Sequence, residues 1–341
     1  MTDNKQHYLI TGGAGFIGSH LAEALLARGD EVTIIDNLST GRFDNVKHLA
    51  NRPGFHFVID TITHEMVMDR LVSECDAIFH LAAAVGVQLI IENPVHVIET
   101  NVLGTHAVLQ AAARYRKPVL LASTSEIYGK STQVPFREDD DRVLGPTTKA
   151  RWSYSDSKAV DEFLALAYHQ QLDLPVIICR FFNTVGPRQT GQYGMVVPRF
   201  VQQALRGDPI TVYGDGEQSR CFCNVADVVR ALLLLTGCEP AIGQVFNVGN
   251  TQETTILELA RRVVAQVRGI PLAQADDDIT FIPYADAYAP GFEDMQRRVP
   301  DAGKLKHLTG WEPQIPLDET LRQVIAYYRT NSSIAADAAK A

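Results

Sequence analysis

The sequence lacks the apolar segments of exported and membrane-spanning proteins. A membrane-spanning helix needs a run of about 18 or more apolar residues, and no such run occurs. The N-terminus, MTDNKQHYLITGG, is polar before it enters a short apolar stretch, so it does not resemble a signal peptide. We therefore predict no membrane association and a cytoplasmic location.

Cysteine is scarce and unevenly placed. The five cysteines are Cys75, Cys179, Cys221, Cys223 and Cys238, and only Cys221 and Cys223 lie close together. An odd number without paired spacing suits neither a disulfide framework nor a zinc site. Reduced thiols and no bound metal are predicted.

Positive charge is also in short supply. The 31 Lys and Arg residues are outnumbered by 40 Asp and Glu residues, giving a formal net charge of −9. An acidic surface repels phosphate backbones, so the composition excludes nucleic acid as an expected partner. A small phosphorylated ligand is still compatible, because a few placed arginines can bind it locally.

Short β-branched runs alternate with helical patterns in the first half of the chain. This alternation predicts βαβ units and a Rossmann-type, doubly wound parallel sheet. The predicted strands are Tyr8–Thr11, Val32–Asp36, Phe55–Asp60, Ala77–Leu81, Val119–Ser123 and Val176–Arg180, and the first helices are Ser19–Arg28, Pro94–Arg114 and Tyr154–Gln171.

The pattern becomes irregular after Arg180 and ends in further helical stretches at Ala226–Leu235, Thr255–Val267 and Leu317–Tyr328. We predict a dinucleotide-binding domain over residues 1–180, to which residues 222–248 return. Residues 181–221 and 249–330 are predicted to form a smaller α/β substrate lobe, and 331–341 a flexible tail.

A glycine-rich turn follows the first strand. Gly12, Gly15 and Gly18 have the spacing that permits a tight turn, a close approach to a pyrophosphate and close helix–strand packing. The second strand ends in Asp36, where a carboxylate binds both ribose hydroxyls and repels a 2′-phosphate. NAD is therefore predicted over NADP, although Arg42 lies close enough in sequence to accommodate such a phosphate.

Other candidate cofactor contacts follow the strands. Asp60 suits either a contact to adenine or a cap at the strand end, and small residues after His80 let the backbone lie along the cofactor. The further set is Phe16, Ile17, Asn37, Asp60, Thr61, Leu81, Ala82 and Ala83.

Tyr154 and Lys158 are spaced i, i+4 and therefore share one face of a helix. A lysine near a phenol lowers its pKa, which makes tyrosine a usable general base. Thr124, Ser125 and Glu126 follow a predicted strand, at the edge of a parallel sheet where ligands bind.

Taken together, these motifs resemble the extended short-chain dehydrogenases/reductases, specifically the nucleotide-sugar epimerase, dehydratase and decarboxylase group. The resemblance runs from about Tyr8 to Tyr328. The matching segments are TGGAGFIGSH, HLAA, TNVLGT around Asn101, STSEIYG, YSDSK, RFFNTVGPR, VYGDGEQSRCF and RRVPDAGKLKHLTGWEP.

The resemblance implies that Tyr154 and Lys158 form the acid/base pair and that Thr124 and Ser125 hydrogen-bond the sugar. It implies NAD as cofactor, with Asn101 near it, a nucleotide-sugar substrate, most simply a UDP-sugar, and a homodimer built through two long helices. The substrate-binding set that it implies is Asn183, Val212, Tyr213, Arg220 and Arg298.

The residues around Glu126 distinguish members of the group. The 4,6-dehydratases of this group have a Thr-Asp-Glu pattern, and Ser125 replaces the Asp here. The Ser-Glu pair and the segment that carries Arg298 are similar to those of UDP-glucuronate decarboxylases. Such an enzyme passes through a 4-keto intermediate and recycles NAD internally, with Glu126 or a water it orients reprotonating C5. The loop Ala84–Leu89 is closer to an epimerase, so a 4-epimerase is the alternative, and a non-catalytic NAD(H) sensor is a remote one.

Overall fold

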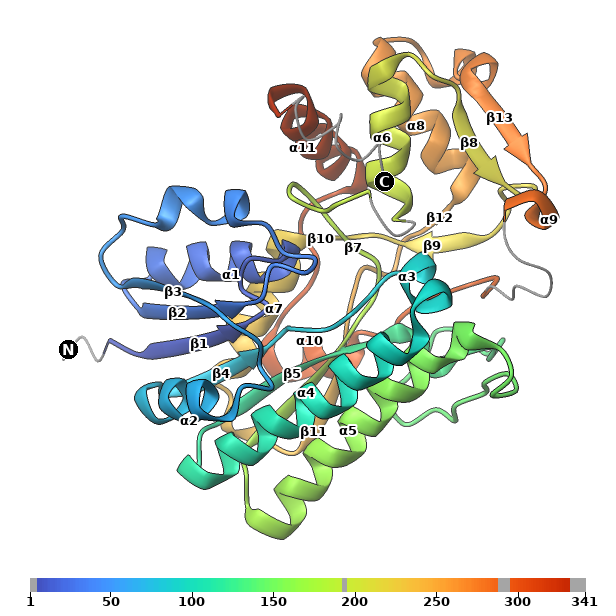
Figure 1. Cartoon of the computed structure of the whole chain (residues 1–341). Coiled ribbons are helices and arrows are strands. Elements are labelled where there is room, and N and C mark those ends of the chain that lie inside the picture. Colours follow the sequence, from blue (N-terminus) through green and yellow to red (C-terminus); the bar gives the residue numbers. More distant parts are fainter. Residues whose placement is uncertain (1–4, 192–194, 288–294, 332–341) are drawn as a thin grey trace.

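The computed structural model describes residues 5–191, 195–287 and 295–331. Its centre is a seven-stranded sheet of order β11-β6-β5-β4-β1-β2-β3, in which every pairing is parallel (Figure 1). The strands are β1 (His7–Thr11), β2 (Glu31–Asp36), β3 (Phe55–Ile59), β4 (Ala77–His80), β5 (Val119–Thr124), β6 (Val176–Phe181) and β11 (Gln244–Val248). The predicted Rossmann-type α/β fold is confirmed.

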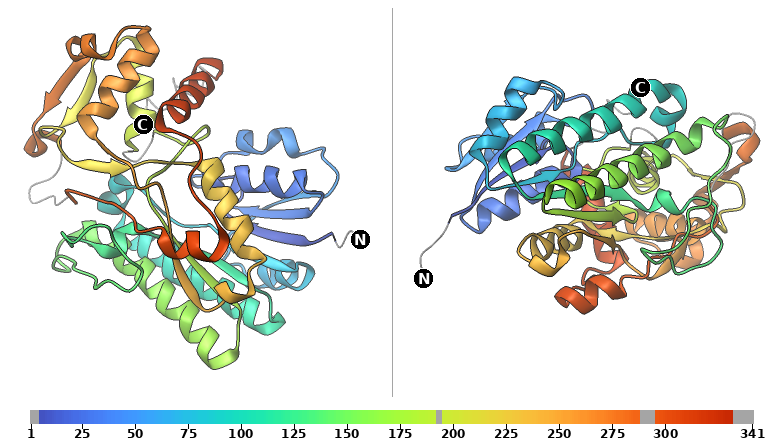
Figure 2. Two further views of the ribbon diagram at one scale, coloured as in Figure 1. Left: turned by 180° about the vertical axis from the view of Figure 1, so that it is seen from behind. Right: turned by 90° about the horizontal axis from the view of Figure 1, so that it is seen from below.

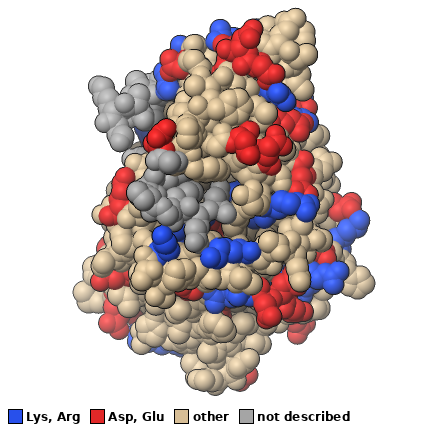
Figure 3. Space-filling model, turned by 90° about the vertical axis from the view of Figure 1, so that its right-hand side faces the viewer, with Lys and Arg blue, Asp and Glu red and all other residues tan. Residues whose placement is uncertain are grey.

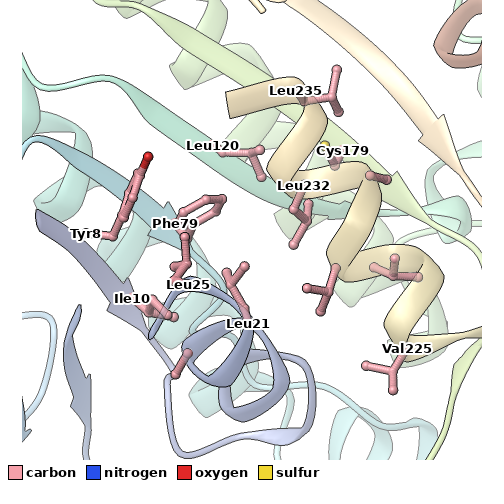
Figure 4. Close-up of a cluster of buried hydrophobic side chains, with 14 of the residues drawn as sticks. Tyr8, Ile10, Leu21, Leu25, Phe79, Leu120, Cys179, Val225, Leu232 and Leu235 are labelled. Atoms are coloured by element: carbon pink, nitrogen blue, oxygen red, sulfur yellow. The ribbon is translucent and has the colours of Figure 1, made fainter. Parts of the chain in front are cut away.

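Helices cover both faces of this sheet, so its strands are apolar on both sides. On one face, α2 (Glu65–Glu74), α4 (Pro94–Tyr115) and α5 (Ser153–Leu172) pack against residues such as Leu9. On the other, α1 (Phe16–Ala27), α7 (Val225–Thr236) and α10 (Gly303–Thr309) pack against residues such as Ile10 (Figures 2 and 4). Helix α1 begins three residues earlier than the predicted start at Ser19.

A second apolar core lies outside the sheet. It is built from α6 (Val196–Arg206), β8 (Ile210–Tyr213), α8 (Ile256–Arg268), β13 (Ile279–Ile282) and α11 (Leu317–Thr330), which form the upper part of Figure 1. Its fully buried residues include Val197, Phe200, Val201, Val263 and Leu321.

The remaining named strands and α-helices are short. They are α3 (Val87–Glu92), β7 (Thr184–Val185), β9 (Ser219–Cys221), β10 (Cys223–Asn224), β12 (Glu253–Thr255) and α9 (Tyr284–Ala287).

The last segment of the predicted smaller lobe packs partly against the sheet. Leu305 and Trp311 fall in the range 249–330 assigned to the smaller lobe, yet both are buried in the same core as Leu232 of α7. The segment that carries these two residues therefore returns to the core between the sheet and α7 near the end of the chain. The predicted tail lies outside the described residues except for Asn331.

The described helices include none that is long and apolar enough to cross a membrane. On the face shown in Figure 3, acidic and basic side chains are interspersed.

Candidate active site

A cavity of about 820 Å³ lies between the carboxyl ends of the sheet strands and the second core. Both parts of the molecule line it, from the glycine-rich loop and strand ends on one side to Tyr213, Arg220 and Arg298 on the other. Ligands bind at this edge of parallel sheets, near the point where the strand order reverses. Here that point lies between β1 and β4.

The glycine-rich loop has the shape of a phosphate cradle. Gly12 has a φ of +69°, and a Cβ there would lie 2.8 Å from the Cα of Ala82. A Cβ on Gly18 would lie 2.4 Å from the carbonyl oxygen of Gly12. Gly15 caps α1, so the helix N-terminus opens into the cavity, where its unpaired N–H groups suit a pyrophosphate.

Asp36 lies at the end of β2 and lines the cavity. Its carboxylate accepts hydrogen bonds from the backbone N–H groups of Ala14 (3.0 Å) and Leu38 (2.8 Å). Burial raises the pKa of Asp36, against the lowering effect of these two N–H donors. The Arg42 side chain does not line the cavity and lies 4.0 Å from Asp44.

Asp60 serves as a strand-end cap and also lines the cavity. Its Oδ1 accepts from the Thr61 N–H at 2.7 Å, and its Oδ2 lies 2.8 Å from His64 Nδ1. Both sequence interpretations are therefore compatible with its position. The other predicted cofactor residues that line the cavity are Phe16, Ile17, Asn37, Thr61, Leu81, Ala82 and Ala83.

Asn101 does not line the cavity, contrary to a direct cofactor contact. It is buried on α4, where its Oδ1 accepts from the Ala84 N–H at 2.8 Å and its Nδ2 donates to Ser157 Oγ at 3.1 Å. Its amide therefore joins α4 to α5 and to the loop after β4. Asn101 is therefore a positioning residue in this structure.

Tyr154 and Lys158 both line the cavity from α5. Burial, followed by the nearby charge of Glu126, raises the pKa of Tyr154, while hydrogen bonding to Thr124 and the charge of Arg298 act to lower it. The ammonium of Lys158 donates to Asp161 Oδ2 at 2.6 Å.

Glu126 is held between two arginines. Its Oε2 accepts from Arg151, and its Oε1 accepts from Arg298 at 3.1 Å. Burial acts to raise the pKa of Glu126, but Arg151 and Arg298 outweigh it and hold that pKa at about 2. Glu126 is therefore an ionised carboxylate at neutral pH and not a proton donor.

Thr124 and Ser125 differ in direction. Thr124 lines the cavity, and its Oγ1 accepts from the Glu126 N–H at 3.2 Å. Ser125 is fully buried and is not among the residues that line the cavity, so the predicted hydrogen bond from Ser125 to the sugar stays a prediction. The chain turns into a 3₁₀ segment, Ser125–Tyr128, which directs this side chain inward.

The far end of the cavity carries the predicted substrate residues. Asn183, Tyr213 and Arg220 line it, and the Arg199 guanidinium lies 4.1 Å from the centre of the Tyr213 ring. Val212 is fully buried in the second core and does not line the cavity, because neighbouring residues of a strand point to opposite sides. A role for Val212 in substrate binding stays a prediction.

Two site residues were not among those predicted from sequence. Arg151 lines the cavity and binds Glu126, and Asp161 binds Lys158. Arg151 stands three residues before Tyr154, so its position beside the catalytic helix was a usable signal. Asp161 reads as one of several charges on a helix and gives no signal of its burial.

A parallel sheet with a glycine-rich loop, an acidic residue ending β2 and a Tyr-Lys pair on one cavity defines a nucleotide-sugar enzyme of the extended short-chain dehydrogenase/reductase type. The chain belongs to the GDP-mannose 4,6-dehydratase family, whose pattern it matches over residues 9–324.

Several curated relatives are decarboxylases. The chain is 42% identical to UDP-N-acetyl-alpha-D-glucosaminuronate decarboxylase of Bacillus cytotoxicus, over 95% of this chain and 98% of that protein. It is 39% identical to UDP-glucuronic acid decarboxylase 1 of Xenopus tropicalis, over 96% of this chain and 73% of that protein.

Solved structures of similar shape include epimerases. UDP-glucose 4-epimerase of Thermotoga maritima has a TM-score of 0.83 and 31% identity, over 96% of this chain and 99% of that one. UDP-glucuronic acid 4-epimerase of Bacillus cereus, in complex with UDP-glucuronic acid and NAD, has a TM-score of 0.83 and 26% identity, over 95% and 99%. All these relatives are enzymes, which supports the prediction of an enzyme over a non-catalytic sensor.

Proposed function

We propose that the protein is an NAD-dependent decarboxylase of UDP-glucuronate or a closely related UDP-uronate. The observation that carries this proposal is the placement of Arg298, Arg151 and Glu126 in the same cavity as Tyr154. Guanidinium groups bind carboxylates in a planar, bidentate geometry, so this end of the cavity suits an acidic sugar. The names of the relatives support decarboxylation of such a sugar.

The residues present fit NAD. The cradle at Gly12 and Gly18 admits no side chain, and the Asp36 carboxylate faces the cavity where ribose hydroxyls are expected. When bound, NAD⁺ supplies a reversible hydride acceptor for C4 of the sugar.

In the proposed reaction, Tyr154 accepts the proton of the sugar 4-hydroxyl as C4 is oxidised. The resulting 4-ketone makes the C5 carboxylate a β-keto acid, which loses CO₂ because the ketone accepts the electron pair. Since Glu126 is ionised, it does not itself donate the proton to C5. It orients the water that supplies this proton instead, while Arg298 holds the substrate. Hydride then returns to C4 and Tyr154 gives its proton back to the 4-oxygen, so the reaction is redox-neutral.

Release of CO₂ from carboxyl-labelled UDP-glucuronate tests this proposal. We expect label release with the wild-type protein, accompanied by a product that lacks the carboxylate. The 2-acetamido analogue of the substrate should be assayed in parallel, because one relative acts on it. No label release from either substrate contradicts the proposed decarboxylation.

A 4-epimerase is the second candidate. The loop Ala84–Leu89 favours it, and here that loop leads into the short helix α3 beside the cavity. An epimerase performs the same oxidation at C4, then rotates the ketone before hydride returns. Interconversion of C4 epimers with the carboxylate retained identifies this activity in the same assay.

NAD⁺ is expected to bind more tightly than NADP⁺. The Asp36 carboxylate faces the cavity and would repel a 2′-phosphate, and the Arg42 side chain lies outside the cavity lining. Calorimetric titration with both cofactors measures the difference, and equal affinities contradict this prediction. The variant Asp36→Ala should reduce the difference in affinity between NAD⁺ and NADP⁺.

We also propose a homodimer with a two-fold interface through α4 and α5. The two helices lie side by side (Figure 1) and carry exposed apolar side chains, among them Val95 and Ile98 on α4 and Val160 and Phe163 on α5. Light scattering at micromolar concentration should give the mass of a dimer. Phe163→Asp should give a monomer, whereas Met66→Asp, at an equally exposed position on α2, should not.

A cytoplasmic location is part of the same proposal. It is supported by the five cysteines, all of which are free thiols in the structure.

A further inference from the structure

The catalytic lysine is held by a buried carboxylate. Lys158 Nζ donates to Asp161 Oδ2 at 2.6 Å, and the two side chains are 3% and 0% exposed. The residues are three apart on α5, so the helix itself brings them together. A buried pair of this kind stays in place because either charge alone would be strongly unfavourable.

The other groups packed around Asp161 carry no charge. Burial raises the pKa of Asp161, against the lowering effects of Lys158 and of a hydrogen bond from Thr105 of α4. The Thr105 hydroxyl is 3.0 Å from His80 Nε2. His80 Nδ1 is 2.7 Å from the hydroxyl of Thr11, which accepts from the Ala82 N–H. Burial lowers the pKa of His80 to about 3, so this chain of hydrogen bonds is neutral at physiological pH.

The remaining nearby charges already have partners. Glu162, the next residue of α5, binds Arg180 at 2.8 Å. Glu126 of the 3₁₀ segment binds both Arg151 and Arg298. Asp161 is therefore the carboxylate that balances Lys158.

We propose that Asp161 is a positioning residue that fixes Lys158 and sets the pH at which Tyr154 gives up its proton. The inference rests on the proposed function, because it takes Tyr154 as the base that oxidation at C4 requires. The positive charge of Lys158 lowers the pKa of Tyr154, and the negative charge of Asp161 raises it. Asp161 therefore offsets part of the effect of Lys158 on that pKa. Burial is the main cause of the raised pKa of Tyr154, and the charges of Glu126 and Asp161 add to it.

Asp161→Asn tests this role, because it keeps the shape and an oxygen that accepts from Lys158 while removing the charge. The acid limb of the pH–rate profile for NADH appearance on substrate addition should then shift to lower pH by about one unit. The ultraviolet phenolate absorbance that is lost on Tyr154→Phe should titrate at lower pH in the Asp161→Asn background, in protein without substrate. Asp161→Glu, which restores the charge, should return both curves toward the wild type.

Glu162→Gln is the matched control, since it removes a buried carboxylate one position along the same helix. It should lower thermal stability without moving either curve. If Asp161→Asn does not fold, Asp161→Ser makes the same change of charge, and the same shift is expected.

An unchanged limb, or one displaced to higher pH, overturns the inference and leaves Asp161 a structural residue. The phenolate titration and the NADH signal do not depend on CO₂ release. Absence of decarboxylation therefore contradicts the proposed function without deciding the role of Asp161.

Discussion

Tyr154→Phe is expected to abolish the NADH absorbance that appears when substrate is added to the NAD-loaded enzyme. Tyr154 lines the cavity beside Thr124 and Lys158, and the substitution removes the oxygen that accepts the 4-hydroxyl proton. A positioned acid–base group contributes about 10²–10⁴-fold to rate, so a loss of that size is expected in kcat. Stopped-flow absorbance during a single turnover measures this step directly.

Tyr168→Phe is the matched control for that experiment. Tyr168 also lies on α5, but it packs against the apolar core between the sheet and helices α2, α4 and α5. It does not line the cavity. Its removal should leave the NADH signal near that of the wild type. A normal NADH signal from Tyr154→Phe means that another group removes the proton, and the assignment of Tyr154 as base is then wrong.

Several predicted site residues that do line the cavity belong to local motifs. Gly12, Gly18 and Asp36 lie where their spacing predicts, because a strand, a tight turn and a helix fix their relative positions within one βαβ unit. Tyr154 and Lys158 share a helix face for the same reason. In such cases, the backbone geometry of one or two elements determines the site.

Adjacent residues of one motif lie differently where the direction of a side chain depends on the rest of the fold. Val212 and Tyr213 are adjacent on β8, yet only Tyr213 faces the cavity. Ser125 follows Thr124 directly, and the 3₁₀ turn buries it. Such residues are neighbours in a sequence motif, but strand alternation and turn geometry point their side chains in different directions.

Contacts between residues far apart in the sequence could not be predicted for a different reason. Glu126 and Arg298 are 172 residues apart, and their ion pair forms only when the late segment returns to the sheet. Asp161 gave no signal because a carboxylate three residues after a lysine is ordinary on an exposed helix face. Its burial follows from the packing of α4 against α5, which the sequence does not specify residue by residue.

Glu126→Gln is expected to lower the free energy of unfolding at neutral pH by about 3–5 kcal/mol, the cost of leaving buried charges without their partner. Both Arg151 and Arg298 face the lost charge, with side chains 4% and 10% exposed. Denaturant unfolding at pH 7 measures the loss. Glu258→Gln, which breaks a more exposed pair with Arg262, should cost less than about 1 kcal/mol.

The pH dependence gives a second check on the same group. The pKa of Glu126 is about 2 in the folded protein and 4.5 ordinarily. A depressed pKa means that the stabilisation is complete above pH 4.5 and is lost as the pH falls toward 2. Unfolding free energies of the wild type should therefore fall more steeply below pH 4.5 than those of Glu126→Gln.

The catalytic effect of Glu126→Gln should differ in kind from that of Tyr154→Phe. Because Tyr154 remains, NADH should still appear. Since C5 is then reprotonated slowly, steady-state carbon dioxide release and product formation should fall by about 10²–10⁴-fold. Removing the charge of Glu126 also removes a cause of the raised pKa of Tyr154, so oxidation itself should not require a higher pH. Wild-type rates of label release from this variant contradict a role for Glu126 after oxidation. The epimerase alternative is favoured instead if neither this variant nor the wild type releases label and the product retains its carboxylate.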